Sequence, residues 1–114
     1  MLYDIRKSVW DAAEACRKIQ AYTARQTLEM YLADNMRRLA IERLFGILGE
    51  AFNRIDDADP SFRDHISEMG NVIGMRNRLA HGYDRTINET VWTATQDYVP
   101  ILTEKLTAWL DVNG

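Results

Sequence analysis

The stretch MRRLAIERLFGILGEAFNRI, residues 36–55, decides the fold of this chain. Its apolar residues recur mostly at steps of three and four: Met36, Leu39, Ala40, Leu44, Ile47, Leu48, Ala51, Phe52 and Ile55. That period places them along one side of an α-helix, and such a stripe is normally buried against other helices. We therefore predict one long amphipathic helix with this side facing the core.

A similar stripe precedes the long helix. It consists of Leu2, Ile5, Val9, Ala12, Cys16 and Ile19, again spaced by three and four residues. Between the two stripes, residues 23–31 predict a short connecting helix. After the long helix, we expect Asp56 to Pro60 to form a turn and Ser61 to open a brief helical segment.

Three further helical segments complete the chain. The first carries Val72, Ile73, Met75 and Leu79 and is expected to end at Gly82, because glycine suits the left-handed position after a helix. Thr86 or Asn88 is expected to cap the next helix, and Pro100 to open or kink the last. No convincing alternation of period two is present. The pattern predicts an all-α fold, an antiparallel bundle of four to five main helices in a single domain over residues 1–114.

Composition narrows the class of protein. A single cysteine, Cys16, rules out an internal disulfide and fits a reducing compartment. The apolar runs are too short to cross a bilayer, and residues 1–7 lack the apolar region of a secretion signal. We expect a cytoplasmic protein without a membrane partner. The net charge of −3 argues mildly against general nucleic-acid affinity, although Arg37, Arg38 and Arg43 could add to a local positive groove.

The run RNRLAHGY, residues 76–83, is too polar to be explained by helical packing alone. His81 has an ordinary pKa near neutrality, so it can deprotonate a 2′-hydroxyl of RNA or protonate the departing 5′-oxygen. The guanidinium of Arg76 matches phosphate oxygens and stabilises the charge that builds on them. Asn77 could hold the imidazole or the substrate, and Arg78 and Arg85 are weaker candidates for substrate binding.

Two features of the run bear on mechanism and assembly. No carboxylate or cysteine cluster with metal-ligand spacing accompanies His81, so we expect neither a metal nor a cofactor. Arg76 and His81 lie roughly 140° apart around an ideal helix, which does not converge them on one small target. Convergence is easier if two copies meet across a two-fold axis, so we expect a functional homodimer.

Structural explanations compete with these functional ones. Cations at a helix C-terminus favour its dipole, so the motif could simply cap carbonyls. His65 is expected to be a structural surface or half-buried residue, Cys16 a core residue, and the three tryptophans packing or interface residues. Glu50 could orient an arginine of the motif, or could lie on a solvated helix face.

The motif Arg76-x4-His81-x-Tyr83, with Asn77 and Gly82, resembles the signature of HEPN-domain ribonucleases, and specifically the HepT family of toxins. Residues 40–51 are similar to the long helix of that family, residues 73–84 to its catalytic core, and residues 91–102 to its closing helix. The resemblance implies a metal-independent endoribonuclease with catalytic Arg76, Asn77 and His81. It also implies a partner, a minimal nucleotidyltransferase antitoxin of the MntA type that transfers AMP to Tyr83.

A second hypothesis is a non-catalytic adaptor, a helical subunit that binds such a nucleotidyltransferase and positions its substrate. The acidic charge of the chain suits that role. RNA cleavage that depends on His81 distinguishes the two hypotheses, since only the first requires the imidazole as a chemical group.

Overall fold

The computed structural model of the chain describes residues 4–79 and 85–114. For residues 85 and 86 it describes the backbone alone. The elements follow in the order α1 (Arg6–Thr23), α2 (Leu28–Ala33), α3 (Asn35–Ala58), the 3₁₀ helix η1 (Pro60–Asp64), α4 (Glu68–Leu79), α5 (Arg85–Asp97) and α6 (Val99–Asn113). No strand occurs within the described ranges. The predicted all-α bundle is confirmed.

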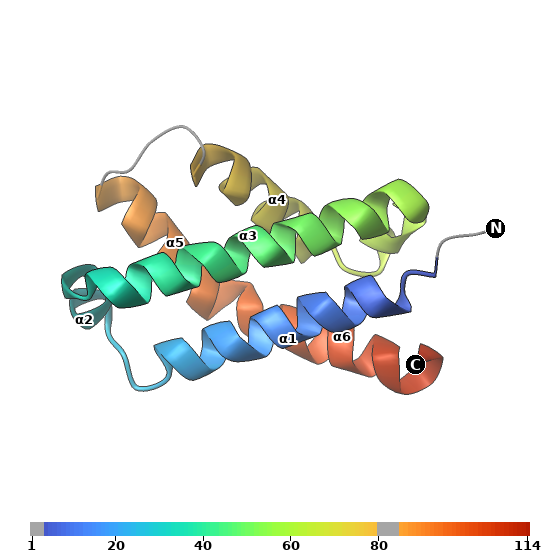
Figure 1. Cartoon of the computed structure of the whole chain (residues 1–114), viewed down its shortest axis with the longest axis horizontal. Helices are drawn as coiled ribbons and strands as arrows, with labels where there is room; N and C mark the ends of the chain where they lie inside the picture. The colour runs from blue at the N-terminus through green and yellow to red at the C-terminus, as the bar shows by residue number, and fades with distance from the viewer. Residues whose placement is uncertain (1–3, 80–84) are drawn as a thin grey trace.

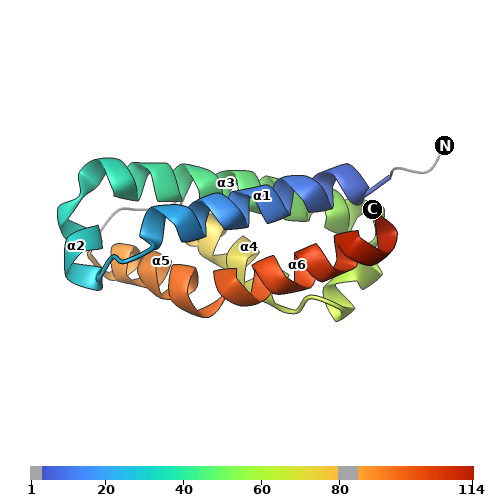
Figure 2. The same cartoon turned by 90° about the horizontal axis from the view of Figure 1, so that it is seen from below.

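The helices pack in two layers. In Figure 1 α3 crosses the whole molecule, with α1 antiparallel beside it, α4 on its other side and α5 passing behind it. Figure 2 shows α1 and α3 together above α5 and α6, with α2 closing one end. The beginning of α1 and the end of α6 lie at the opposite end from α2. In the described part of the chain, no helix combines the length and the apolar character needed to cross a membrane.

A continuous apolar core lies between the layers. Its largest fully buried side chains are Tyr31, Phe45, Phe52, Phe62, Ile19, Ile41, Leu48, Ile55, Ile66, Met69, Leu102 and Leu106. Cys16 is buried there, as predicted, and desolvation raises the pKa of its thiol to about 12. Trp92 packs against Tyr31, with ring centroids 5.4 Å apart, and Trp109 packs edge-on against Phe62 at 5.5 Å.

The first half of the predicted α3 stripe is wrong. Met36 is 82% exposed and Leu39 is 56% exposed, whereas Ile41 and Phe45, which the stripe left out, are fully buried. The physical reason is the way the neighbouring helices pack, because Ile41 and Phe45 face the apolar core between the layers while Met36 and Leu39 face solvent. The stripe agrees with the structure only from Leu44 onward.

Helix boundaries depart from the prediction in three places and agree in a fourth. The connecting helix α2 spans Leu28–Ala33 and not residues 23–31, and Thr23 still belongs to α1. α3 continues to Ala58, so most of the expected turn after Asp56 is helical. α5 begins at Arg85, so Thr86 and Asn88 lie within the helix and not at the position before it, where a cap residue stands. The break before α6 falls at Tyr98, and Pro100 occupies the first turn of α6 as predicted, because proline has no N–H to donate there.

Candidate functional site

α4 carries the described part of the RNRLAHGY motif and presents it on two different sides. Met69, Val72 and Met75 are buried and hold the helix against the core. Arg76 follows Val72 by four residues and so projects from the same side, toward α3. Glu68 in the first turn and basic residues in the last turn both favour the helix dipole, which explains part of the charge pattern without any reference to function.

The side chain of Arg76 lies across the backbone of α3 at Gly49. A Cβ atom added to Gly49 would overlap Cδ of Arg76 and would lie 3.2 Å from its Nε. Any other residue at position 49 would therefore push the arginine away. Gly49 is buried, and Arg76 retains about a third of its side-chain surface, 32%, toward solvent. The methylene chain of Arg76 thus packs on Gly49, and its guanidinium lies at the surface.

The carboxylate of Glu50 is the next group along α3. Its Oε1 lies 3.5 Å from Nη2 of Arg76, at the outer limit of a hydrogen bond, and half of its side chain is exposed. A single long contact of this kind orients the guanidinium and leaves its other N–H groups to bind an anion. The expectation that Glu50 could orient an arginine of the motif therefore has a specific partner in Arg76.

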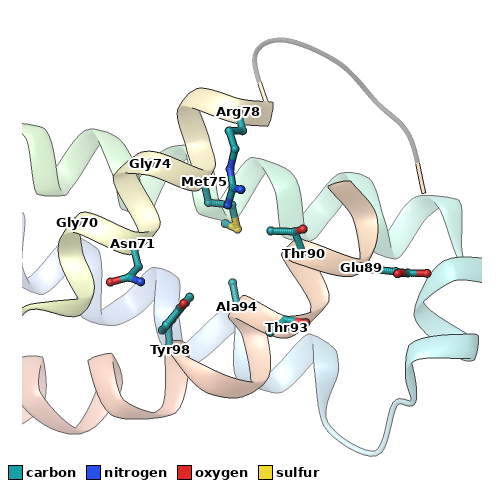
Figure 3. Close-up of a pocket in the computed structure, with 10 residues that line it drawn as sticks. All are labelled: Gly70, Asn71, Gly74, Met75, Arg78, Glu89, Thr90, Thr93, Ala94 and Tyr98. Atoms are coloured by element: carbon teal, nitrogen blue, oxygen red, sulfur yellow. The ribbon is translucent and has the colours of Figure 1, made fainter. Parts of the chain in front are cut away.

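The two other described side chains of the motif, Asn77 and Arg78, do not converge with Arg76. Asn77 is exposed on the outer side of α4. Arg78 points into a groove between α4 and α5, on the side of α4 away from α3 (Figure 3). His81, Gly82 and Tyr83 lie outside the described residues, and of Arg85 the structure describes only that it begins α5.

The expected positive groove does not include Arg37 and Arg38. Arg37 donates to Asp34 and to the carbonyl of Tyr22, and Arg38 donates to the carbonyl of Leu32. Both arginines therefore fasten the beginning of α3 to neighbouring segments. His65 is exposed and lies edge-on to Phe62 at 6.5 Å, in keeping with its predicted structural role.

Sequence reasoning did not assign a role to Gly49, Asn71, Gly74 or Tyr98, although Gly49 contacts Arg76 and the other three line the groove that Arg78 enters. A signal for Gly49 was present, because glycine inside a long helix is unfavourable and calls for a packing reason. Within the described residues, no three histidine, cysteine, aspartate or glutamate side chains gather closely enough to hold a metal ion.

Comparison with known proteins gives one match. The family model described as "Ribonuclease HepT-like" matches residues 12–108 of the 114-residue chain. No curated protein and no solved structure matches it. The matched range includes α3, α4 and α5, and with them Gly49, Glu50 and the whole RNRLAHGY motif. The chain belongs to the HepT-like ribonuclease family.

Proposed function

We propose that this chain is a metal-independent endoribonuclease, the toxin of a toxin–antitoxin pair in the cytoplasm. The observation that carries the proposal is the position of Arg76 near the end of α4, five residues before His81 in the sequence. Its side chain packs on Gly49, and Glu50 contacts its guanidinium at the surface. Membership of the ribonuclease family supports RNA as the substrate. A fixed guanidinium is suited to a phosphate that gains charge during reaction.

The reaction is a transesterification that releases the downstream (3′) fragment of the RNA. His81 takes the proton from the 2′-hydroxyl, whose oxygen attacks the adjacent phosphorus. The bond from phosphorus to the 5′-oxygen breaks, and that oxygen takes a proton from water while His81 returns its own proton to solvent, giving a cyclic phosphate and a 5′-hydroxyl. Arg76 stabilises the charge on the non-bridging oxygens, and Asn77 positions the substrate or the imidazole. No metal ion is needed for this sequence of steps.

The proposal includes a homodimer, with the ends of α4 near the two-fold axis. Helix geometry supports this, since Arg76 and His81 are five residues apart and diverge by roughly 140° on a straight helix. A second copy could supply the missing half of each site. Mixing Arg76→Ala and His81→Ala proteins tests it, because a mixed dimer would hold one intact site and regain activity. Mixtures as inactive as their components would contradict a shared site.

The proposal also includes regulation by a nucleotidyltransferase antitoxin of the MntA type. The oxygen of Tyr83 would attack the α-phosphorus of ATP, lose its proton and release pyrophosphate. The attached AMP would bring bulk and negative charge two residues from His81, where an RNA phosphate must approach. Mass spectrometry after incubation with the antitoxin and ATP tests this step. An AMP adduct that persists in Tyr83→Phe would contradict it.

Total cellular RNA, incubated with the purified chain in the presence of a chelator, tests the catalytic activity. The wild type should cut RNA and His81→Ala should not. Cleavage that survives in His81→Ala would refute the assignment. A wild-type chain that cuts nothing, yet binds the nucleotidyltransferase, would favour the non-catalytic adaptor instead.

A further inference from the structure

The groove between α4 and α5 has a volume of about 670 Å³. Figure 3 shows Arg78 reaching into it from the end of α4, with Asn71 further back on the same helix. Tyr98, at the break between α5 and α6, projects into the groove at the other end, and Thr90 of α5 lies between. The volume is in the range of pockets that hold a small organic ligand.

Two glycines of α4 keep this groove open. Gly70, Gly74 and Arg78 are spaced by four residues, so they follow one another along a single side of the helix. A Cβ atom at Gly74 would meet nothing within 4 Å, and one at Gly70 would make only ordinary contact with Arg63, at 3.6 Å. Neither glycine is therefore required by close packing. Glycine in a helix interior is nonetheless among the least favourable residues, so its presence twice on one side requires another reason.

We propose that the groove holds one nucleotide of the RNA, next to the linkage that is cut. This inference rests on the proposed function and extends it to the substrate-binding surface. The guanidinium of Arg78 would bind the phosphate, the ring of Tyr98 would stack on the base, and the amide of Asn71 would reach the base edge. The combination of a cation, an aromatic face and an amide in one groove is typical of single-strand recognition.

The charges around the groove are compatible with a phosphate at Arg78. Among the described residues that line the groove, Glu89 is the acidic one, and Figure 3 shows its side chain directed away from Arg78. Arg76 faces α3 while Arg78 faces α5, so an RNA strand that crosses the end of α4 could place a phosphate on each side. The two arginines would then serve successive parts of the substrate, Arg76 the reacting phosphate and Arg78 its neighbour.

The test measures binding of a fluorescently labelled single-stranded RNA by anisotropy, in a His81→Ala background so that no turnover interferes. Gly74→Leu fills the groove with a side chain that favours helix more than glycine does, and it should weaken binding about tenfold or more. Arg78→Gln should lower the slope of log affinity against log salt by about 0.7, the value for one phosphate contact on a single strand.

Matched variants control for bulk and charge elsewhere. Ala21→Leu adds a similar side chain to the exposed side of α1, and Arg25→Gln removes one exposed cation from the turn after α1. Both should bind RNA as the background protein does. Melting temperature and light scattering on each variant verify that the fold and assembly are intact. If Gly74→Leu and Arg78→Gln bind RNA with unchanged affinity and salt slope, the groove is not a nucleotide site.

The outcome separates this inference from the proposed function. A wild-type chain that cuts RNA, with groove variants that bind normally, would overturn the nucleotide groove alone. A wild-type chain that cuts nothing, with RNA binding that still depends on Gly74 and Arg78, would overturn the nuclease and support the groove. An absence of RNA binding in the background protein would overturn both.

Discussion

Replacing Gly49 by alanine tests whether the seat of Arg76 matters for catalysis. The added Cβ would overlap Cδ of Arg76, so the arginine must leave its present path across α3. If Arg76 stabilises the reacting phosphate, we expect cleavage to fall by about 10²-fold, the usual loss when one such donor is displaced. The substrate concentration at half-maximal rate should change less than the maximal rate, because the contact strengthens in the transition state.

Stability should change little in the same variant. Alanine in place of glycine favours a helix interior by about 1 kcal/mol, whereas crowding a packed position costs about 1–3 kcal/mol. The side chain of Arg76 is flexible and partly exposed, so it can move, and the crowding falls near the lower bound. The two effects then nearly offset each other. The net shift in melting temperature should stay within roughly 8 °C, at about 4 °C for each kcal/mol.

Gly46→Ala is the matched control, because a Cβ at Gly46 on the same helix meets nothing within 4 Å. It should raise the melting temperature by a few degrees and leave cleavage unchanged. The assay follows cleavage of a short labelled RNA, with oligomeric state measured for every variant. Full activity in Gly49→Ala would refute the reasoning. A further check is the double variant with Arg76→Ala, which should be no less active than Arg76→Ala alone, since both changes remove one interaction.

Three further predictions concern the fold. Tyr31→Phe removes a buried hydroxyl that has no hydrogen-bond partner among the described residues. The free energy of unfolding, measured by chemical denaturation, should be unchanged or about 1 kcal/mol higher. A clear loss of stability would mean that the hydroxyl has a partner. Burial raises the pKa of Cys16 from 9.0 to about 12, so the contribution of Cys16 to stability should be constant below pH 9 and fall as the pH rises toward 12. Alkylation of Cys16 at pH 8 should require denaturant, and rapid alkylation of the native chain would contradict this. The carboxylate of Asp34 accepts a hydrogen bond from the backbone N–H of Arg37 at 3.0 Å, and this bond lowers the pKa of the carboxyl below 3.8. Asp34→Ala should therefore lower the melting temperature at pH 7, and the difference from the wild type should shrink as the pH falls below 3.8. An equal difference at all pH values would show that the carboxylate charge plays no part in the cap.

The helical character of the chain followed from spacing in the sequence, as did the position of Pro100 in α6. The exposure of Met36 and Leu39 did not follow, because their three- and four-residue spacing is also compatible with burial. Which side of α3 meets solvent depends on where the neighbouring helices pack. The start of α5 was also missed, since Thr86 and Asn88 have the side chains of good caps but occupy helix interior.

By itself, the sequence determined that the protein is helical and that arginines and an asparagine lie near the end of one helical segment, with a histidine soon after them in the chain. Both depend on local order along the chain, since a helix is formed by residues three and four apart. Only the tertiary structure decided what each arginine meets. Arg76 reaches Glu50, 26 residues away in the chain, while Arg78 faces the groove toward α5. The reason is that contacts between helices depend on how the helices cross, and the crossing of α3 and α4 is set by the packing of the whole core.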